Sequence, residues 1–327
     1  MSYPFKNLVF EGGGVKGLAY VGALEVLEAR DVLTGIVRVG GASAGAITAL
    51  LLSVGYEVHE VKSILEGMDF EEFKDGGLFP LLATRLLCKF GLYKGDRFKE
   101  WIGELIHMKT GLKNPTFAQF EAYRKTSSLK TRSIYILGTN LSTRFSEVFS
   151  HETTPGMSII EAVRISMSIP LFFAAVKDHA DYYVDGGVLN NYPIQLFDDI
   201  KYRIGSGTHA SSSDGYKNPQ TLGFRLDSKE EIGVFRDQKA PRHDKINSLK
   251  DYIAALAGTL MALQDNRHLE EEDWNRTVYI NTIGVHTTDF NLSPERKQKL
   301  IESGCAGALR YFEWWDSANQ KTSGRKE

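Results

Sequence analysis

The chain has 327 residues, 42% of them hydrophobic, so it is long enough to bury one large α/β core. It carries 39 Lys and Arg against 41 Asp and Glu. The resulting formal charge of −2 argues against nucleic acid as the main partner, because phosphate binding needs a basic excess. Two cysteines are too few for a disulfide framework. No Sec-type signal peptide and no transmembrane segment is recognisable, so we expect a cytoplasmic protein whose membrane contact is peripheral.

The chain opens with two units in which a strand, a glycine turn and a helix follow one another. Short apolar runs at 8–10 and 36–39 predict buried strands that end in glycines. Apolar residues at helical spacing follow each turn, over 15–29 and 46–54, and another amphipathic helix is expected at 58–65. Consecutive units of this kind predict a parallel, doubly wound sheet.

A more aromatic and basic segment, 70–132, then interrupts this alternation and predicts a cap beside the sheet. Residues 85–132 hold 11 Lys or Arg and only 4 Asp or Glu. Aromatic residues lie among them, including Phe90, Tyr93, Phe98 and Trp101. Basic and aromatic side chains together indicate a surface that rests on an anionic lipid membrane. The alternative is a cap that packs its apolar face on the core and leaves its basic face in solvent.

Strand and helix signals resume beyond residue 132. Strands are predicted at 133–138, 182–184, 222–226 and 278–283, and helices at 158–167, at 249–263 and from Pro294, which Ser293 caps. We expect residues 1–327 to form a single domain, with the cap at 70–132 and a helical C-terminal extension at 248–327.

The run Gly41-Ala42-Ser43-Ala44-Gly45 fits the pattern G-x-S-x-G, in which a sharp turn between strand and helix presents a serine nucleophile. A tight glycine turn with a helix-capping serine is the alternative. The position between a predicted strand and a predicted helix favours the nucleophile. Only one strand and helix unit precedes Ser43, which fits an ordinary α/β-hydrolase poorly because that fold builds several strands before its elbow.

The first glycine turn, Gly12-Gly13-Gly14-Val15-Lys16-Gly17, offers consecutive backbone N–H groups at a helix N-terminus. Such groups suit a developing oxyanion, and Lys16 adds positive charge. The alternative is a dinucleotide loop, for which Asp31 lies near the position of a ribose-binding acid. The Walker A pattern is absent from the sequence.

A third motif, Asp185-Gly186-Gly187, follows the predicted strand at 182–184. An aspartate at a strand end beside two glycines is a candidate general base. The same tripeptide begins at Asp75 in a region without a comparable strand, so we interpret Asp75 as a turn residue.

In this order, the three motifs resemble those of the patatin-like phospholipases over about residues 6–195, and the stretches at 163–170 and 190–193 are similar to that family too. The resemblance implies a three-layer α/β/α fold with a central, mainly parallel sheet and a helical cap. It also implies that Ser43 is the nucleophile, Asp185 the other member of a Ser–Asp dyad, and Gly12, Gly13 and Gly14 the oxyanion hole. Many members have Arg in that loop, whereas this chain has Lys16 and so keeps the charge.

The resemblance therefore predicts a lipid acyl hydrolase that cleaves fatty acyl esters of phospholipids or lysophospholipids through an acyl-enzyme at a membrane surface. No metal and no cofactor is expected. Four further glycines would support the turns: Gly41, Gly45, Gly186 and Gly187.

Four alternatives remain open at this point. A neutral glyceride lipase or an acyltransferase would use the same site, and a catalytically silent lipid-binding module would retain the fold. A Ser-Asp-His triad would need a histidine that follows Asp185 in the chain. The candidates are His209, His243, His268 and His286.

Overall fold

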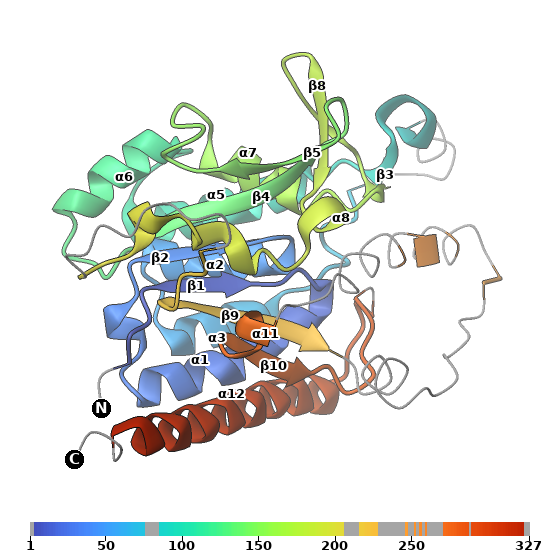
Figure 1. The fold of residues 1–327 in the computed structure, drawn as a ribbon. Helices are drawn as coiled ribbons and strands as arrows, with labels where there is room; N and C mark the ends of the chain where they lie inside the picture. Colours follow the sequence, from blue (N-terminus) through green and yellow to red (C-terminus); the bar gives the residue numbers. More distant parts are fainter. Residues whose placement is uncertain are drawn as a thin grey trace.

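The computed structural model describes residues 3–75, 85–205, 216–227, 246–247, 252, 255–256, 259, 271–287 and 289–323. Figure 1 shows a central sheet with helices on both of its faces. This arrangement confirms the predicted α/β fold with layers of helices around a sheet.

The main sheet is mostly parallel. Five parallel strands lie in the order β10 (Thr277–Asn281), β9 (Thr221–Asp227), β1 (Asn7–Phe10), β2 (Arg38–Gly41) and β4 (Ser133–Asn140). The other three strands join this sheet by antiparallel pairing. Strands β8 (Asp181–Asp185) and β5 (Phe145–Phe149) each pair with β4, and β7 (Val176–Asp178) pairs with β8. The glycine motifs after β1 and β2 follow neighbouring parallel strands, so both turns lie at the same edge of the sheet.

Helix α2 (Ala44–Val54) begins directly after the second glycine turn. All eleven of its residues are buried, as expected of a helix that is apolar on every side. The first turn leads into a short 3-10 helix, η1 (Gly14–Leu18), and then α1 (Ala19–Ala29). A third helix, α3 (Val58–Gly67), follows α2 and presents Val58, Val61 and Leu65 to the core.

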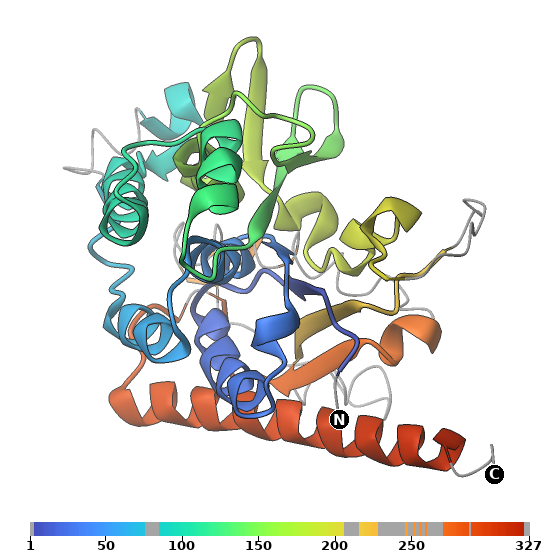
Figure 2. The ribbon, with the colours of Figure 1, turned by 90° about the vertical axis from the view of Figure 1, so that its left-hand side faces the viewer.

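The long helix α12 (Pro294–Ser323) runs along the outside of the molecule against α1 and β10 (Figures 1 and 2). Ser293 caps it as predicted, because its hydroxyl accepts the Arg296 N–H at 3.3 Å. Glycines allow α12 and α1 to cross closely. A Cβ on Gly22 would lie 1.8 Å from the Ile301 carbonyl oxygen, so no larger residue fits at that crossing.

The cap contains β3 (Gly91–Tyr93), α5 (Asp96–Thr110) and α6 (Phe117–Thr126). Strand β3 pairs with β6 (Leu171–Phe173) in a separate two-stranded sheet. Two of the aromatic residues expected at a lipid surface face inward instead: Phe98 is 1% exposed, and Trp101 packs on Phe73 with ring centroids 5.3 Å apart. For these residues the packed-cap interpretation is correct, because the apolar face of α5 covers the core.

Asp75 lies outside the sheet and has a structural role. Its carboxylate accepts the backbone N–H groups of Lys94 at 2.6 Å and Asp96 at 2.7 Å, and so caps the start of α5. We interpret Asp75 from the sequence as a turn residue, and the structure gives its side chain this helix-capping role instead.

The remaining elements complete the layers: α7 (Ile159–Ser166), α8 (Gly187–Asn190), α11 (Glu271–Trp274), and the 3-10 helices η2 (Leu33–Gly35), η3 (Ile194–Phe197) and η4 (Ile200–Tyr202). The helix expected at 249–263 falls almost entirely outside the described residues. Within the described part of the chain, no helix is both long enough and apolar enough to cross a bilayer.

Candidate active site

Ser43 occupies the sharp turn between β2 and α2. Its backbone has φ 52° and ψ −125°, a conformation that residues with a side chain rarely adopt. A Cβ on Gly45 would lie 2.3 Å from the Phe10 carbonyl oxygen, so the turn needs glycine to pass this close to β1. The Ser43 side chain makes no capping hydrogen bond to α2. This geometry disagrees with a helix-capping serine and matches the strained turn of a nucleophile elbow.

Asp185 ends β8 in a fully buried position. Its backbone N–H donates to the Ser168 carbonyl at 2.9 Å, and its Oδ1 accepts the Gly187 N–H at 2.7 Å. Burial raises the pKa of Asp185 to about 7, although the Gly187 N–H and the Ser43 hydroxyl each act to lower it. The carboxylate is therefore much more basic than an ordinary aspartate.

The structure brings Ser43 and Asp185 together from positions 142 residues apart in the chain. The Ser43 hydroxyl is close enough to favour the ionised form of Asp185. Asp185 Oδ2, however, is buried without hydrogen-bond geometry to any described partner, and Ser43 Oγ lies 3.7 Å from Met167 Sδ. Catalytic hydrogen bonds are often long in unliganded enzymes and tighten when substrate binds. Asp185 Oδ2 has no hydrogen bond and lies near the Ser43 hydroxyl, which is compatible with proton transfer between the two groups.

The first glycine turn lies beside Ser43. A Cβ on Gly12 would lie 3.1 Å from the Ser43 Cβ. The Gly12 N–H donates to the Asn191 carbonyl at 3.0 Å, whereas the N–H groups of Gly13 and Gly14 make no hydrogen bond within the described chain. Two of the three predicted donors, both in buried positions, therefore have no hydrogen-bond partner within the described residues. Lys16 lies in η1, and its side chain passes close to Gly13.

Several residues around the pair had no assigned role in the sequence. Ser166 Oγ accepts the Ser43 backbone N–H at 2.9 Å, which holds the elbow in place. Asn191 Nδ2 donates to the Gly12 carbonyl at 3.2 Å and so fixes the glycine turn. Ser166 lies in the stretch 163–170 and Asn191 in the stretch 190–193, both of which resemble the family. The sequence therefore marked these stretches but indicated no role for either residue.

Arg164 is a further buried residue near the site. Its guanidinium donates to the Lys94 carbonyl, the Ala174 carbonyl and Ser168 Oγ, and it lies over the Phe173 ring at 5.2 Å. Burial lowers the pKa of Arg164 to about 10. These contacts join the cap to the segment that carries Ser166 and Ser168, so Arg164 positions the site without contacting Ser43.

Histidine contacts to the pair are absent from the described structure: no hydrogen bond or ion pair joins Ser43 or Asp185 to a histidine within 3–75, 85–205 or 271–287. His286 is exposed beyond β10, and its backbone N–H donates to Asp289. The other candidates, His209, His243 and His268, lie outside the described residues. The described positions also contain no group of three His, Cys, Asp or Glu side chains arranged to hold a metal ion.

Comparison with known proteins identifies the family of the chain. The family model described as patatin-like phospholipase matches residues 8–198, which include Ser43, Asp185 and both glycine turns. The chain is 32% identical over 304 residues to protein R571 of Acanthamoeba polyphaga mimivirus, and the match covers 91% of each chain. It is 28% identical over 198 residues to a protein of Invertebrate iridescent virus 6 named probable lipid hydrolase 463L, which covers 61% of this chain and 64% of that protein.

Among solved structures, the fold is similar to that of VipD from Legionella pneumophila. The TM-score is 0.62 at 19% sequence identity, and the match covers 95% of this chain and 67% of VipD. At this identity the likeness concerns the fold. The family match, which spans more than half of the sequence, establishes that the chain belongs to the patatin-like phospholipase family.

Proposed function

We propose that this chain is a lipid acyl hydrolase in which Ser43 is the nucleophile and Asp185 the general base. The observation that carries the proposal is the pairing of a strained elbow serine with a fully buried aspartate whose pKa is raised to about 7. A base with that pKa can accept a proton near neutral pH, and a serine hydroxyl needs such a base to become nucleophilic.

The reaction proceeds in two halves. Asp185 takes the Ser43 proton while Oγ bonds to the acyl carbon. The proton then passes to the leaving alcohol as the ester bond breaks, which leaves an acyl-enzyme. In the second half Asp185 takes a proton from water, the hydroxide attacks the acyl carbon, and the fatty acid leaves as Ser43 regains its proton.

The oxyanion that forms in each half needs hydrogen-bond donors. Gly13 and Gly14 fit this role, because their N–H groups have no hydrogen-bond partner within the described residues and the glycine turn lies beside Ser43. Gly12 serves differently in this proposal: its N–H is bonded to Asn191, and its missing side chain lets the turn approach Ser43. Gly41, Gly45, Gly186 and Gly187 support the turns that carry the two reacting residues.

The substrate proposed is a fatty acyl ester of a phospholipid or lysophospholipid. The family to which the chain belongs and the name of its iridescent virus relative support a lipid substrate. A neutral glyceride or an alcohol acceptor in place of water would use the same residues. These options are separated by measuring fatty acid release from phosphatidylcholine, lysophosphatidylcholine and triacylglycerol with and without added glycerol.

We also propose that the enzyme docks on anionic membranes through residues 87–94. Leu87 is 79% and Phe90 50% exposed, and Lys89 and Lys94 are exposed beside them. Phe90 packs edge-on against Tyr182 at 5.5 Å, on the strand that ends at Asp185. Exposed apolar and basic side chains on one segment favour an anionic lipid surface.

This docking is tested by a double variant, Lys89→Gln with Lys94→Gln, assayed on anionic vesicles and on a soluble short-chain ester. Activity on vesicles should fall several-fold while activity on the soluble ester stays unchanged. The matched control changes Lys113 and Lys130, two exposed lysines elsewhere in the cap, to Gln. Equal losses on both substrates would show that these lysines act through the fold.

The nucleophile itself is tested with a fluorophosphonate ester, which forms a covalent adduct with an activated serine. Intact mass should show one adduct on the protein, peptide mapping should place it on Ser43, and Ser43→Ala should abolish it. An adduct on another serine, or full hydrolysis by Ser43→Ala, would contradict the proposal.

A further inference from the structure

Asn191 holds the first glycine turn at two points. Its backbone carbonyl accepts the Gly12 N–H at 3.0 Å, and its side-chain Nδ2 donates to the Gly12 carbonyl at 3.2 Å. Asn191 is 3% exposed, and a Cβ on Gly12 would lie 2.3 Å from Asn191 Oδ1, so the two residues are in direct contact inside the protein. A buried amide that donates to a backbone carbonyl fixes the direction in which that carbonyl points.

The direction of the Gly12 carbonyl decides where the Gly13 N–H points. Both groups belong to one peptide unit, which is planar and trans, so they point in opposite directions. The bond from Asn191 to the carbonyl therefore directs the Gly13 N–H away from Asn191. That N–H has no hydrogen-bond partner within the described residues, and it is one of the two groups proposed above to stabilise the oxyanion.

The backbone beside this peptide does not fix its orientation. Glycine flanks the peptide on both sides, and a glycine backbone can rotate through conformations that a Cβ would forbid. The next peptide differs, because the Gly13 carbonyl accepts the Lys16 N–H at 3.1 Å and this bond of η1 sets the direction of the Gly14 N–H. Of the two proposed donors, the Gly13 N–H is therefore the one whose direction depends on a side chain from a distant part of the chain.

Glu11 orients the Asn191 amide in turn. Glu11 is 1% exposed and directly precedes the glycine turn. Its Oε1 accepts Asn191 Nδ2 at 3.4 Å, and its Oε2 accepts the Leu226 N–H on β9. An amide side chain has a donor end and an acceptor end, whereas a carboxylate offers acceptors. Glu11 therefore favours the orientation in which Nδ2 of Asn191, and not Oδ1, faces the Gly12 carbonyl.

We infer that Asn191 is a positioning residue for the oxyanion hole, and that Glu11 assists it by orienting its amide. Without that amide the Gly12–Gly13 peptide can turn over, which would replace the proposed N–H donor by a carbonyl oxygen. The inference rests on the proposed hydrolase function and deepens it, because it names the residues that control one oxyanion donor.

The kinetic test replaces Asn191 by Leu, which is similar in size and cannot donate a hydrogen bond. On p-nitrophenyl butyrate, Asn191→Leu should lower kcat by about 10²- to 10³-fold, the effect of removing one oxyanion donor, with little change in KM. Glu11→Gln should lower kcat less, because its one amide oxygen can replace only one of the two acceptors. Asn190→Leu, at the neighbouring half-buried position, is the matched control and should keep wild-type activity.

A thionoester substrate separates loss of the oxyanion donor from general damage to the fold. Sulfur accepts hydrogen bonds weakly, so an enzyme that stabilises an oxyanion should prefer p-nitrophenyl butyrate to its thiono analogue. Asn191→Leu should lose most of this preference, and Asn190→Leu should retain it. The ratio of the two rates does not depend on the fraction of protein that is folded, and Glu11→Gln provides the same comparison if Asn191→Leu does not fold. A preference that these variants leave unchanged would overturn the inference.

Crystal structures separate this inference from the proposed reaction, because they require no turnover. In the wild type the Gly12 carbonyl should face Asn191, and in Asn191→Leu the Gly12–Gly13 peptide should be turned over. An unchanged peptide in the variant would overturn the inference even in an active hydrolase. A turned peptide in the variant, together with a wild-type protein that hydrolyses no ester, would refute the hydrolase proposal and leave standing the role of Asn191 in directing the Gly13 N–H.

Discussion

Hydrolysis should increase with pH as Asp185 ionises, because only the carboxylate can accept the Ser43 proton. Burial raises the pKa of this group to about 7. With that pKa, about a tenth of the free enzyme is ionised at pH 6 and about nine-tenths at pH 8. The value of kcat/KM for a soluble ester should therefore rise about tenfold across this interval. An aspartate with an ordinary pKa would give a flat profile there.

The assay uses p-nitrophenyl butyrate, so that membrane docking does not contribute, with absorbance read at the wavelength where nitrophenol and nitrophenolate absorb equally. The pH dependence of kcat/KM reports the ionisation of the free enzyme. Near-UV circular dichroism over the same range checks that the fold is intact. A profile that stays flat down to pH 5 would refute the assignment of Asp185 as a base with a raised pKa.

Substitution of Asp185 tests the same residue directly. Asp185→Asn keeps the shape but removes the base, so kcat should fall by about 10²- to 10⁴-fold. Combining it with Ser43→Ala should add little, because residues that act as a unit lose activity together. Asp181→Asn, on the same strand, is the matched control and should remain active. A loss produced instead by His286→Gln would assign the base to a histidine.

Two predictions concern the scaffold. Burial alone would raise the pKa of Glu152, but hydrogen bonds from two tyrosines and a lysine outweigh it and lower the pKa to about 2. Glu152→Gln should therefore lower the urea midpoint of unfolding at pH 7. The difference in midpoint from wild type should shrink as the pH falls from about 5 toward 2, because Glu152 becomes protonated there. A difference that does not change with pH would contradict a stabilising role of the Glu152 charge. Asp75→Ala removes the carboxylate that caps α5 and should cost about 0.5–2 kcal/mol of unfolding free energy in urea titrations, whereas no change would show that the cap adds nothing.

The sequence predicted the parts of the molecule that local patterns specify. Apolar runs that end in glycines identified β1 and β2, and G-x-S-x-G placed Ser43 at the turn between strand and helix. The position of Asp185 at a strand end was predictable for the same reason. In each case the signal and the structure it specifies lie within a few residues of each other.

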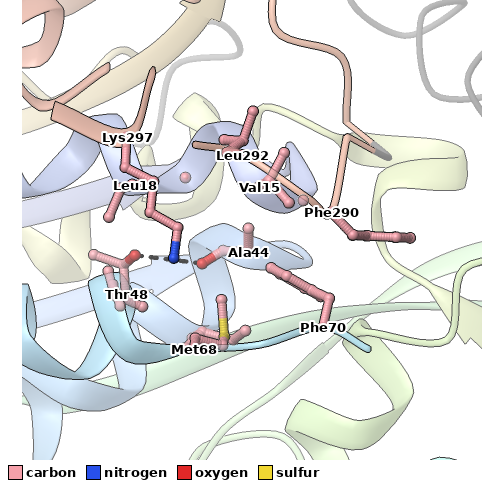
Figure 3. A pocket seen from close by; sticks show the side chains of 13 residues that line it. Val15, Leu18, Ala44, Thr48, Met68, Phe70, Phe290, Leu292 and Lys297 are labelled. Carbon is pink, nitrogen blue, oxygen red and sulfur yellow. Dashed lines mark hydrogen bonds between the residues drawn. The ribbon is translucent and has the colours of Figure 1, made fainter. Parts of the chain in front are cut away.

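Features that depend on distant parts of the chain could not be predicted in this way. The bond between Ser43 and Ser166 joins residues 123 positions apart, and no local period indicates it. For Phe98 the sequence offered both a lipid-facing and a core-facing position, and the core against which α5 packs decides between them. Val15 and Phe290 likewise line one apolar pocket (Figure 3) although they lie near opposite ends of the chain. Such contacts follow from tertiary packing, on which single-sequence patterns carry no information.

The geometry of Ser43 also predicts that the candidate site lowers the stability of the fold. A residue with a side chain at φ 52° and ψ −125° carries about 1–3 kcal/mol of backbone strain, which glycine does not. Glycine loses about 0.5–1 kcal/mol more chain entropy on folding. Ser43→Gly should therefore unfold at higher urea concentration than Ser43→Ala, by about 1 kcal/mol in unfolding free energy, although both variants lack the hydroxyl and should be inactive. Because the two differ only in a methyl group at the strained position, the comparison isolates the backbone. If Ser43→Gly were the less stable of the two, the elbow would be unstrained, and its unusual dihedral angles would have no bearing on how Ser43 is presented to a substrate.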